Sequence, residues 1–475
     1  MPSTLYSAAI DLGATSGRVI LGAWSKNQLT LTEAHRFPNS YRELGAHAYW
    51  ELGTLWHEVQ TGLRKAVALL PKGAKLASVG VDTWGCDHVL LNAAGRLVFP
   101  THAYRDNRTQ AGLAALAARG ADHLYAATGI PNVFYNSSLQ LAETVASCPA
   151  ITQLATRCLF LPDYFNFLLS GKMENELTVA STSQLLDVNA PAWSRTALEH
   201  FRIPPAWFTT PVLAGRKLGP VTSLPELADA EVIAVPGHDT ACAYDAMPAS
   251  PEGGDLFLSS GTWSLVGLEN PTPLLGPDAL AARVANERTG AGGYRPLTNV
   301  PGLFLLEQTL LEFNARPATP KAWDALITAA EKLPVPALLL DTTDAAFMAP
   351  KSMRAAIDAQ LKKKKSPVPK DLPAYTRLIC DSIAHGHANA AANFEKMTGR
   401  KFRRILMVGG GSKNRLLCQA TADAAGIPVL SFNLEGTAVG NLASQLIALG
   451  AVKDLATFRR LLAADLKQKT YQPRA

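Results

Sequence analysis

One aspartate of the sequence follows a short apolar run at a position suited to holding a carboxylate still. Residues 233–235 predict a buried strand, a Pro-Gly turn follows, and small residues then favour a helix. Asp239, flanked by His238 and Thr240, is therefore predicted on a rigid turn, where it could accept a proton from a substrate hydroxyl. A structural role is the alternative, because an aspartate at a strand-to-helix turn also serves as an N-cap.

Three glycine-bearing turns, at residues 13–17, 261–262 and 409–411, have the chemistry for phosphate binding. The first two lie at the tips of predicted hairpins, and the third follows a strand and opens a helix. Small residues let backbone amides approach a phosphate closely, and a helix N-terminus adds favourable polarity. None of the turns has the G-x-x-x-x-G-K-[ST] pattern, so the sequence disfavours a P-loop NTPase.

The elements that must position these turns predict an α/β fold. Apart from the two glycine hairpins, strands are predicted at 76–83, 404–408 and 428–432, a further hairpin around Ala94-Gly95, and helices at 52–70, 161–171, 375–397, 412–425 and 437–449. The two glycine hairpins share one layout and each opens about half of the chain, which indicates a duplicated fold. The Pro- and Gly-rich segment 246–254 predicts a boundary, giving domains 1–247 and 248–475.

Composition and charge exclude several classes of protein. The 475 residues suffice for two domains, and 48% hydrophobic with 18% charged residues is ordinary globular composition. The net charge of +6 is small and scattered, so no nucleic-acid partner is expected, and the run Lys362–Lys365 predicts a solvated helix end. Six cysteines without C-x-x-C spacing, no signal-peptide layout and no membrane-spanning apolar run predict a cytoplasmic protein without a membrane partner.

In this order, the motifs resemble those of the FGGY carbohydrate kinases, in the actin, hexokinase and Hsp70 superfamily. The likeness covers nearly the whole chain and is carried by residues 11–18, 81–87, 103–109, 238–240, 258–264, Asn299 with Gly302, and 408–414. The Tyr-Arg-Asp, Ser-Gly-Thr-Trp-Ser and His-Asp-Thr sequences resemble the branch that acts on L-rhamnulose.

The resemblance implies two RNase H-like domains of the actin/hexokinase type that flank a deep catalytic cleft. It implies transfer of the γ-phosphoryl group of ATP to the 1-hydroxyl of L-rhamnulose, with Asp239 as the base and Asp11 as the Mg²⁺ residue. The residues expected to meet the sugar are Gly85, His238, Asp239, Thr240 and Asn299. Those expected at the nucleotide are Ala14, Thr15, Ser16, Gly17, Arg18, Thr262, Glu307, Gly410 and Asn414. The expected partners are a ketose and ATP alone, with the chain a monomer or a weak homo-oligomer.

Three positions depart from the family pattern. Cys86 stands beside Gly85 where an aliphatic residue is usual, and we expect a small buried hydrophobe there. Glu307 replaces a glutamine, and phosphates would repel its carboxylate unless Mg²⁺ or a lysine screens the charge. Pro301 replaces a flexible residue before Gly302.

Substrate and class leave alternatives open. A polar set, Asp82, Asp87, Arg105 and Asp106, supplies charged groups suited to adjacent hydroxyls, while Trp84 or Trp263 could face a 6-methyl group or belong to the core. Another ketose, such as L-fuculose or L-xylulose, remains an alternative substrate. A non-catalytic nucleotide-driven switch is the alternative class, although it has no use for a base on the sugar side.

Overall fold

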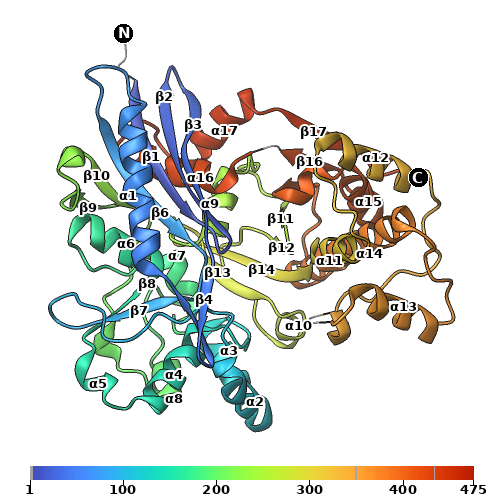
Figure 1. Ribbon diagram of the computed structural model, residues 1–475, viewed down its shortest axis with the longest axis horizontal. Coiled ribbons are helices and arrows are strands. Elements are labelled where there is room, and N and C mark those ends of the chain that lie inside the picture. Colours follow the sequence, from blue (N-terminus) through green and yellow to red (C-terminus); the bar gives the residue numbers. More distant parts are fainter. Residues whose placement is uncertain (1–3, 348–349, 433, 475) are drawn as a thin grey trace. The chain divides into compact units, whose positions relative to one another are not determined.

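The computed structural model describes residues 4–347, 350–432 and 434–474, which form two compact units (Figure 1). Unit 1 comprises Met1–Pro248, Glu269–Pro296 and Gly436–Asp465, and unit 2 comprises Ala249–Leu268, Leu297–Glu435 and Leu466–Ala475. The units therefore differ from the two contiguous domains expected from the sequence, because two later segments of the chain belong to unit 1.

Unit 1 is built on a sheet of six strands in the order β3-β2-β1-β6-β10-β9. The strands are β1 (Leu5–Leu12), β2 (Ser16–Ser25), β3 (Gln28–Pro38), β6 (Leu76–Thr83), β9 (Arg216–Pro220) and β10 (Glu231–Ala234). The first three are antiparallel neighbours, β1 runs parallel to β6, β6 parallel to β10, and β9 closes the edge antiparallel to β10.

Unit 2 repeats this pairing plan strand for strand. Six neighbouring strands of its seven-stranded sheet have the order β14-β12-β11-β15-β16-β17, with β11 (Asp255–Ser260), β12 (Trp263–Gly267), β14 (Tyr294–Pro301), β15 (Arg404–Val408), β16 (Val429–Phe432) and β17 (Gln468–Tyr471). Here too a hairpin and a third antiparallel strand precede two parallel strands and an antiparallel edge strand. The duplicated layout predicted from the two glycine hairpins is confirmed.

Helices cover both faces of the unit 1 sheet, so successive residues of β1 enter different apolar clusters. Ile10 and Leu12 pack in the cluster that contains residues of α1 and α6, whereas Ala9 packs with residues of α16. These helices are α1 (Leu52–Ala68), α6 (Leu161–Ser170) and α16 (Gly436–Ala448). In Figure 1, α1 lies along the front of this sheet. Burial on both faces makes β1 an apolar strand, with the acidic residue Asp11 next to its last residue, Leu12.

Small residues explain why α16 belongs to unit 1 and not to the nucleotide half expected from the sequence. A side chain at Gly440 would overlap the backbone of Cys242, and one at Gly436 would lie 3.7 Å from Ala243. Gly440 therefore lets α16 lie directly against α9 (Asp239–Ala246), the helix that begins with the predicted base, whereas a Cβ at Gly436 would make an ordinary contact.

The other helices and the hairpin predicted from the sequence can be compared with the structure. The expected helices appear as α1, α6, α14 (Leu372–Thr398), α15 (Arg415–Ala425) and α16, and Gly171 ends α6 with a φ of 75°. The hairpin expected around Ala94-Gly95 is present in short form: Leu91 and Leu97 form an antiparallel bridge, Asn92 N donates to Arg96 O at 2.9 Å, and Val98 N donates to Leu90 O at 3.0 Å. The sequence did not indicate that β7 (His88–Leu91) also pairs with β8 (Arg157–Phe160).

The remaining elements complete each unit. Unit 1 also contains β4 (Tyr41–Leu44), β5 (His47–Trp50), β13 (Ala285–Arg288), α2 (Gln110–Arg119), α3 (Asp122–Thr128), α4 (Ser137–Ser147), α5 (Ile151–Leu154), α7 (Leu177–Ala180), α8 (Arg195–Phe201), α10 (Pro277–Ala281) and α17 (Leu455–Asp465). Unit 2 also contains α11 (Phe304–Glu312), α12 (Pro320–Glu331) and α13 (Met353–Lys363). Residues 362–365, the basic run, are exposed at the end of α13 as expected.

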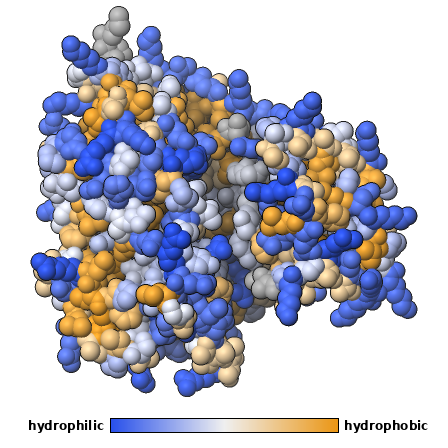
Figure 2. All heavy atoms as spheres, in the orientation of Figure 1, coloured by the Kyte–Doolittle hydropathy of each residue, from blue (hydrophilic) through white to orange (hydrophobic). Residues whose placement is uncertain are grey.

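Hydrophilic and hydrophobic residues are interspersed over the face drawn in Figure 2. Within the described ranges, none of the helices combines the length and the apolar character needed to cross a bilayer.

Candidate active site

Three carboxylates gather in unit 1 where strands of its sheet end. Asp11 and Asp82 are partners in the register of β1 and β6, and Asp239 begins α9 shortly after β10. Burial, the charge of Asp11 and, more weakly, the charge of Asp239 raise the pKa of Asp82 well above its usual range, against a hydrogen bond from Asn441. Each of the other two carboxylates is therefore close enough to influence Asp82 electrostatically.

The surroundings of Asp82 and Asp11 suit a hard cation. Asp82 is fully buried; its Oδ2 accepts a 2.6 Å hydrogen bond from Asn441 Nδ2, but its Oδ1 has no partner among the described residues. Arg18 donates to Asp11 Oδ2 from Nε at 2.8 Å and from Nη2 at 2.6 Å. An unpartnered buried oxygen among clustered carboxylates is the donor chemistry that Mg²⁺ accepts.

The first loop predicted to bind phosphate is the turn between β1 and β2. Gly13 N donates to Ser16 O at 3.0 Å, and Asn39 holds the loop from outside through Thr15 O and Gly13 O, at 3.0 and 2.8 Å. Thr15 is exposed, Ala14 and Ser16 are half-buried, and a side chain at Gly17 would overlap the ring of Phe37. The loop is thus a fixed hairpin tip, and Arg18 beside it is engaged with Asp11.

Asp239 does not act as the N-cap of its helix. His238 occupies the N-cap position of α9 and makes no side-chain capping bond, while Asp239 is the first helical residue. Its Oδ1 accepts from Thr240 N at 2.6 Å and Thr240 Oγ1 at 3.1 Å. Its Oδ2 has no hydrogen bond among the described residues, and the side chain is 30% exposed. That oxygen is available to a hydroxyl donor.

His238 is oriented by a buried ion pair that the sequence analysis missed. Its Nδ1 lies 2.9 Å from Glu287 Oε2, and Glu287 pairs with the fully buried Arg295. Burial alone would raise the pKa of Glu287, but the charges of Arg295 and His238 hold it below its usual range. Glu287 lies on β13 and Arg295 on β14, and no motif in the sequence marks either residue.

A second buried acid, also missed, holds the turn before Asp239. Glu176 Oε2 accepts from Gly237 N at 2.9 Å, and from Thr178 N and Val179 N at 2.9 and 3.1 Å. One carboxylate oxygen therefore fixes the backbone of Gly237 to the first turn of α7. No local sequence pattern indicates this contact, because it joins residues 61 positions apart.

The segment that follows β6 is packed against Thr182. A Cβ at Gly85 would lie 3.0 Å from Thr182 Oγ1, and Cys86 N donates to the same oxygen at 3.1 Å. Cys86 has a φ of 73°, a left-handed conformation that non-glycine residues seldom adopt. Burial raises the pKa of its thiol far above the usual range, so Cys86 is the small buried residue that we expected and not a reactive thiol.

Two of the polar residues assigned to sugar hydroxyls are engaged within the protein. The oxygens of Asp87, which is fully buried, accept from Trp50 Nε1 at 2.6 Å, Trp84 Nε1 at 2.8 Å, Tyr104 N at 3.1 Å and Gln140 Nε2 at 3.1 Å. Asp106 caps a short 3₁₀ turn through Arg108 N at 2.8 Å and also accepts from Ala48 N at 2.7 Å. These bonds orient both carboxylates within the protein, and their contact with sugar hydroxyls stays a prediction.

The two other members of that set, and the two tryptophans, differ in environment. Asp82 belongs to the carboxylate cluster, and Arg105 is exposed, with Nε 3.1 Å from Tyr104 Oη. Trp84 is only 6% exposed, whereas Trp263 is 42% exposed.

In unit 2 the second and third glycine turns contact each other. Gly409 has a φ of 86°, and a Cβ there would lie 2.5 Å from Ser260 O. A Cβ at Gly411 would overlap the side chain of Ser260, whereas one at Gly410 would meet nothing within 4 Å. Ser260 ends β11 immediately before the exposed Thr262 turn, so Gly410 and Thr262 belong to one backbone assembly.

Residues 302–304 also contact this assembly. A Cβ at Gly302 would lie 2.6 Å from Gly261 O, and the same oxygen accepts from Leu303 N at 2.8 Å. Phe304 N donates to Thr262 O at 3.2 Å. The end of β14 and the start of α11 therefore support the hairpin tip directly.

The other residues predicted in unit 2 have separate partners. Asn414 is the N-cap of α15, with Oδ1 accepting from Leu417 N at 3.2 Å. Glu307 Oε2 lies 3.0 Å from Arg316 Nε, so an arginine supplies the screening cation that its carboxylate requires. Asn299 is exposed on β14 and belongs to unit 2, whereas the other predicted sugar residues belong to unit 1.

Comparison with known families decides the class. The N-terminal domain of the FGGY family of carbohydrate kinases matches residues 6–243, and the C-terminal domain matches residues 256–449. The chain belongs to the FGGY family of carbohydrate kinases. It is thus an enzyme, a sugar kinase, with ATP as the co-substrate that the family implies.

Relatives and solved structures agree with this membership. A protein named rhamnulokinase from Pectobacterium carotovorum is 38% identical over 98% of this chain and 93% of its own length, and one from Klebsiella pneumoniae is 36% identical over 99% and 95%. Crystal structures of gluconate kinase from Lactobacillus acidophilus and xylulose kinase from Rhodospirillum rubrum each cover 99% of this chain and 94% of their own, with TM-scores of 0.82 and 0.77 at 16% and 18% identity. The expected actin/hexokinase-type fold is confirmed.

Proposed function

We propose that this FGGY kinase transfers the γ-phosphoryl group of ATP to the 1-hydroxyl of L-rhamnulose, with Mg²⁺ bound to the nucleotide. The observation that carries the choice of sugar is the name rhamnulokinase, shared by four relatives that are 35–38% identical over 98–99% of this chain. The carboxylate geometry of unit 1 supports the chemistry.

Asp239 acts as the general base in this proposal. As the 1-hydroxyl oxygen attacks the γ-phosphorus, its proton passes to Asp239 Oδ2, and the bond from the γ-phosphorus to the β–γ bridging oxygen breaks, so that ADP leaves with that electron pair. Thr240 holds Oδ1 and leaves Oδ2 open, which supports this role. His238, fixed by Glu287, supplies a ring nitrogen beside the base for a neighbouring hydroxyl.

Asp11 and Asp82 would hold the Mg²⁺, directly or through water. The ion neutralises charge on the phosphate oxygens when it is bound. Asp82 is the addition that the structure makes to the sequence-based assignment, because its buried Oδ1 has no protein partner among the described residues. A neighbouring cation would favour the ionised form of this carboxylate, whose pKa burial raises.

The remaining assignments extend the proposal. Backbone and hydroxyl groups of the first loop, at Ala14, Thr15, Ser16 and Gly17, and of Thr262 would meet phosphate oxygens. Gly410, Asn414 and Glu307 would line the nucleotide, and Gly85 and Asn299 would meet the sugar. Arg18 contributes through Asp11, with which it pairs.

We also infer a reducing compartment, the cytoplasm, for this chain. All six cysteines are free, five of them buried, which is usual where thiols stay reduced. None of these thiols is assigned a role in catalysis, so exposure of the purified protein to a disulfide-forming oxidant should leave its kinase activity unchanged.

Sugar-dependent ADP release tests the proposal. The panel is L-rhamnulose, L-fuculose, L-xylulose, D-xylulose and glycerol, each compared by kcat/KM, with a sugar-free reaction as the baseline. We expect L-rhamnulose to be the best substrate, because a site that pairs each hydroxyl loses about 1–3 kcal/mol for each buried polar group left unpaired. A preference for D-xylulose or glycerol would overturn the choice of sugar. ADP release at one rate with and without sugars would overturn the kinase mechanism and favour a nucleotide-driven switch.

A further inference from the structure

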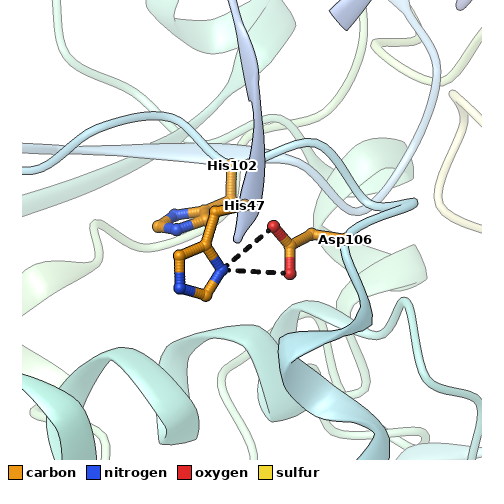
Figure 3. Close-up of side chains that lie close together, drawn as sticks. All are labelled: His47, His102 and Asp106. Atoms are coloured by element: carbon orange, nitrogen blue, oxygen red, sulfur yellow. Dashed lines mark hydrogen bonds and ion pairs between the residues drawn. The ribbon is translucent and has the colours of Figure 1, made fainter. Parts of the chain in front are cut away.

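A group of three potential metal ligands lies in unit 1 apart from the residues assigned above. His47 begins β5, His102 forms a single bridge with the neighbouring Tyr49, and Asp106 follows in the same loop. One ligand atom from each residue lies within 4.8 Å of the others, and Figure 3 shows the Asp106 carboxylate turned toward the His47 ring, with His102 beside it. Within the described ranges, this is the only such group of histidine, cysteine and acidic side chains.

Asp106 is held in place by backbone hydrogen bonds. Its side chain is 3% exposed, with Oδ2 2.7 Å from Ala48 N and Oδ1 2.8 Å from Arg108 N. Each oxygen accepts one backbone hydrogen bond and retains a lone pair for a further ligand, the arrangement of an oriented metal-binding carboxylate.

His102 is an imidazole without a hydrogen-bond partner for its buried nitrogen. The residue is 8% exposed, and its Nδ1 has no partner among the residues that the structure describes. A neutral imidazole is the form that coordinates metals, and a buried nitrogen left unpaired is costly unless something binds it.

His47 leaves the group open to solvent. Its side chain is 41% exposed, and its Nδ1 lies 3.2 Å from Asp106 Oδ2. The ring stands nearly perpendicular to that of His102, at 86°, with centroids 5.4 Å apart. An ion can therefore reach the two buried ligands from the His47 side, and water can occupy the positions that the protein leaves vacant.

We propose that His47, His102 and Asp106 bind a divalent transition-metal cation of the zinc class, with water completing its coordination. Two imidazoles and one carboxylate match the ligand set of open zinc sites, whereas Mg²⁺ prefers oxygen ligands throughout. Bonds of about 2.0–2.2 Å to such an ion require the three ligand atoms to approach within about 3–4 Å of one another. The half-exposed His47 can make this adjustment by side-chain rotation. Arg108, the nearby cation, forms an ion pair with Glu143.

A bound ion would join two segments that position the sugar-side loop. The β4–β5 hairpin already meets residues 101–103 through Trp50 N to Thr101 O at 2.9 Å and Ala103 N to Ala48 O at 2.8 Å. Trp50 and Tyr104 then both donate to Asp87, two residues after Gly85. The ion would strengthen this junction, and the inference does not depend on which sugar the enzyme phosphorylates.

Calorimetric titration of the full-length protein with Zn²⁺, in a buffer containing excess Mg²⁺, tests the inference. We expect one Zn²⁺ per chain with micromolar or tighter affinity, and a raised melting temperature in its presence. His47→Gln should weaken this affinity at least about tenfold, because it removes one of three protein ligands. His102→Gln should do the same, and circular dichroism will check that each variant is folded.

Two matched variants make the test specific. His57→Gln removes an exposed histidine of α1 and should leave the affinity unchanged. His123→Gln breaks the other histidine pair, where His123 Nε2 lies 3.3 Å from His200 Nδ1, and should also leave it unchanged. Absence of Zn²⁺ binding to the unmodified chain, or binding that survives His47→Gln but disappears with His123→Gln, would overturn the proposal.

Discussion

Replacing Glu287 by glutamine should separate the support of His238 from the chemistry of Asp239. Glu287→Gln leaves Arg295, which is fully buried, without its carboxylate partner. Removing one member of a buried ion pair costs about 3–5 kcal/mol. The hydrogen bond from Arg295 Nε to Arg288 O at 3.0 Å remains, so we expect the lower end, about 3 kcal/mol.

Urea unfolding followed by circular dichroism measures this loss. Glu199→Gln is the control, because it breaks an exposed i,i+4 pair with Arg195, and solvent screening makes the contribution of such a pair to stability small. The double variant Glu287→Gln/Arg295→Met should recover much of the stability, since it removes the uncompensated charge as well. Equal losses in Glu287→Gln and Glu199→Gln would refute the reasoning.

The kinetic effect of Glu287→Gln has a different signature. His238 loses the carboxylate that orients its ring, so the KM for sugar should rise while the KM for ATP stays constant. The double variant should not recover the sugar KM, because the carboxylate is still absent. Because the pKa of folded Glu287 lies below 4.5, its stabilising effect is present above that pH and is lost as pH falls through the folded value.

Two further predictions concern Asp245 in unit 1 and Gly409 in unit 2. Burial raises the pKa of Asp245 from 3.8 to about 7, so its contribution to stability is full below 3.8 and is lost as pH rises through about 7. Asp245→Asn should therefore gain stability relative to the unmodified chain as pH rises over that range, measured by urea midpoints; a constant difference would contradict this. Gly409→Ala should lower the melting temperature, because its Cβ would lie 2.5 Å from Ser260 O at a φ of 86°. Gly410→Ala, with nothing within 4 Å of its Cβ, is the matched control, and equal melting temperatures for the two variants would count against the packing argument.

Local patterns predicted the elements that local chemistry determines. Apolar runs with small residues at a tip specified both hairpins, and the repeated layout revealed the duplication. Helix ends followed from short-range signals such as Gly171, whose left-handed conformation ends α6. The short hairpin around Ala94-Gly95 was predicted as well, whereas the pairing of β7 with residues 157–160 was not, because those residues lie far along the chain.

The supports of the site could not be predicted because they join distant residues. Glu176 contacts Gly237 across 61 positions, and Asn441 reaches Asp82 across 359. A glutamate at position 176 and an asparagine at position 441 match no motif, so the sequence did not indicate these contacts. At Asp87 a charged residue within a polar motif suggested a ligand contact, but no local pattern indicated that Trp50 Nε1, Tyr104 N and Gln140 Nε2 would donate to its carboxylate.

Turnover of Asp239→Asn tests the central claim most directly. The asparagine keeps the shape of the side chain and an oxygen for Thr240, so the fold and the affinity for ATP should survive, and L-rhamnulose-dependent ADP release should fall by roughly a hundredfold or more. Calorimetric ATP binding measured on the same sample separates a lost base from a lost site. Turnover within a few-fold of the unmodified enzyme would contradict the account and return Asp239 to a structural role at the start of α9.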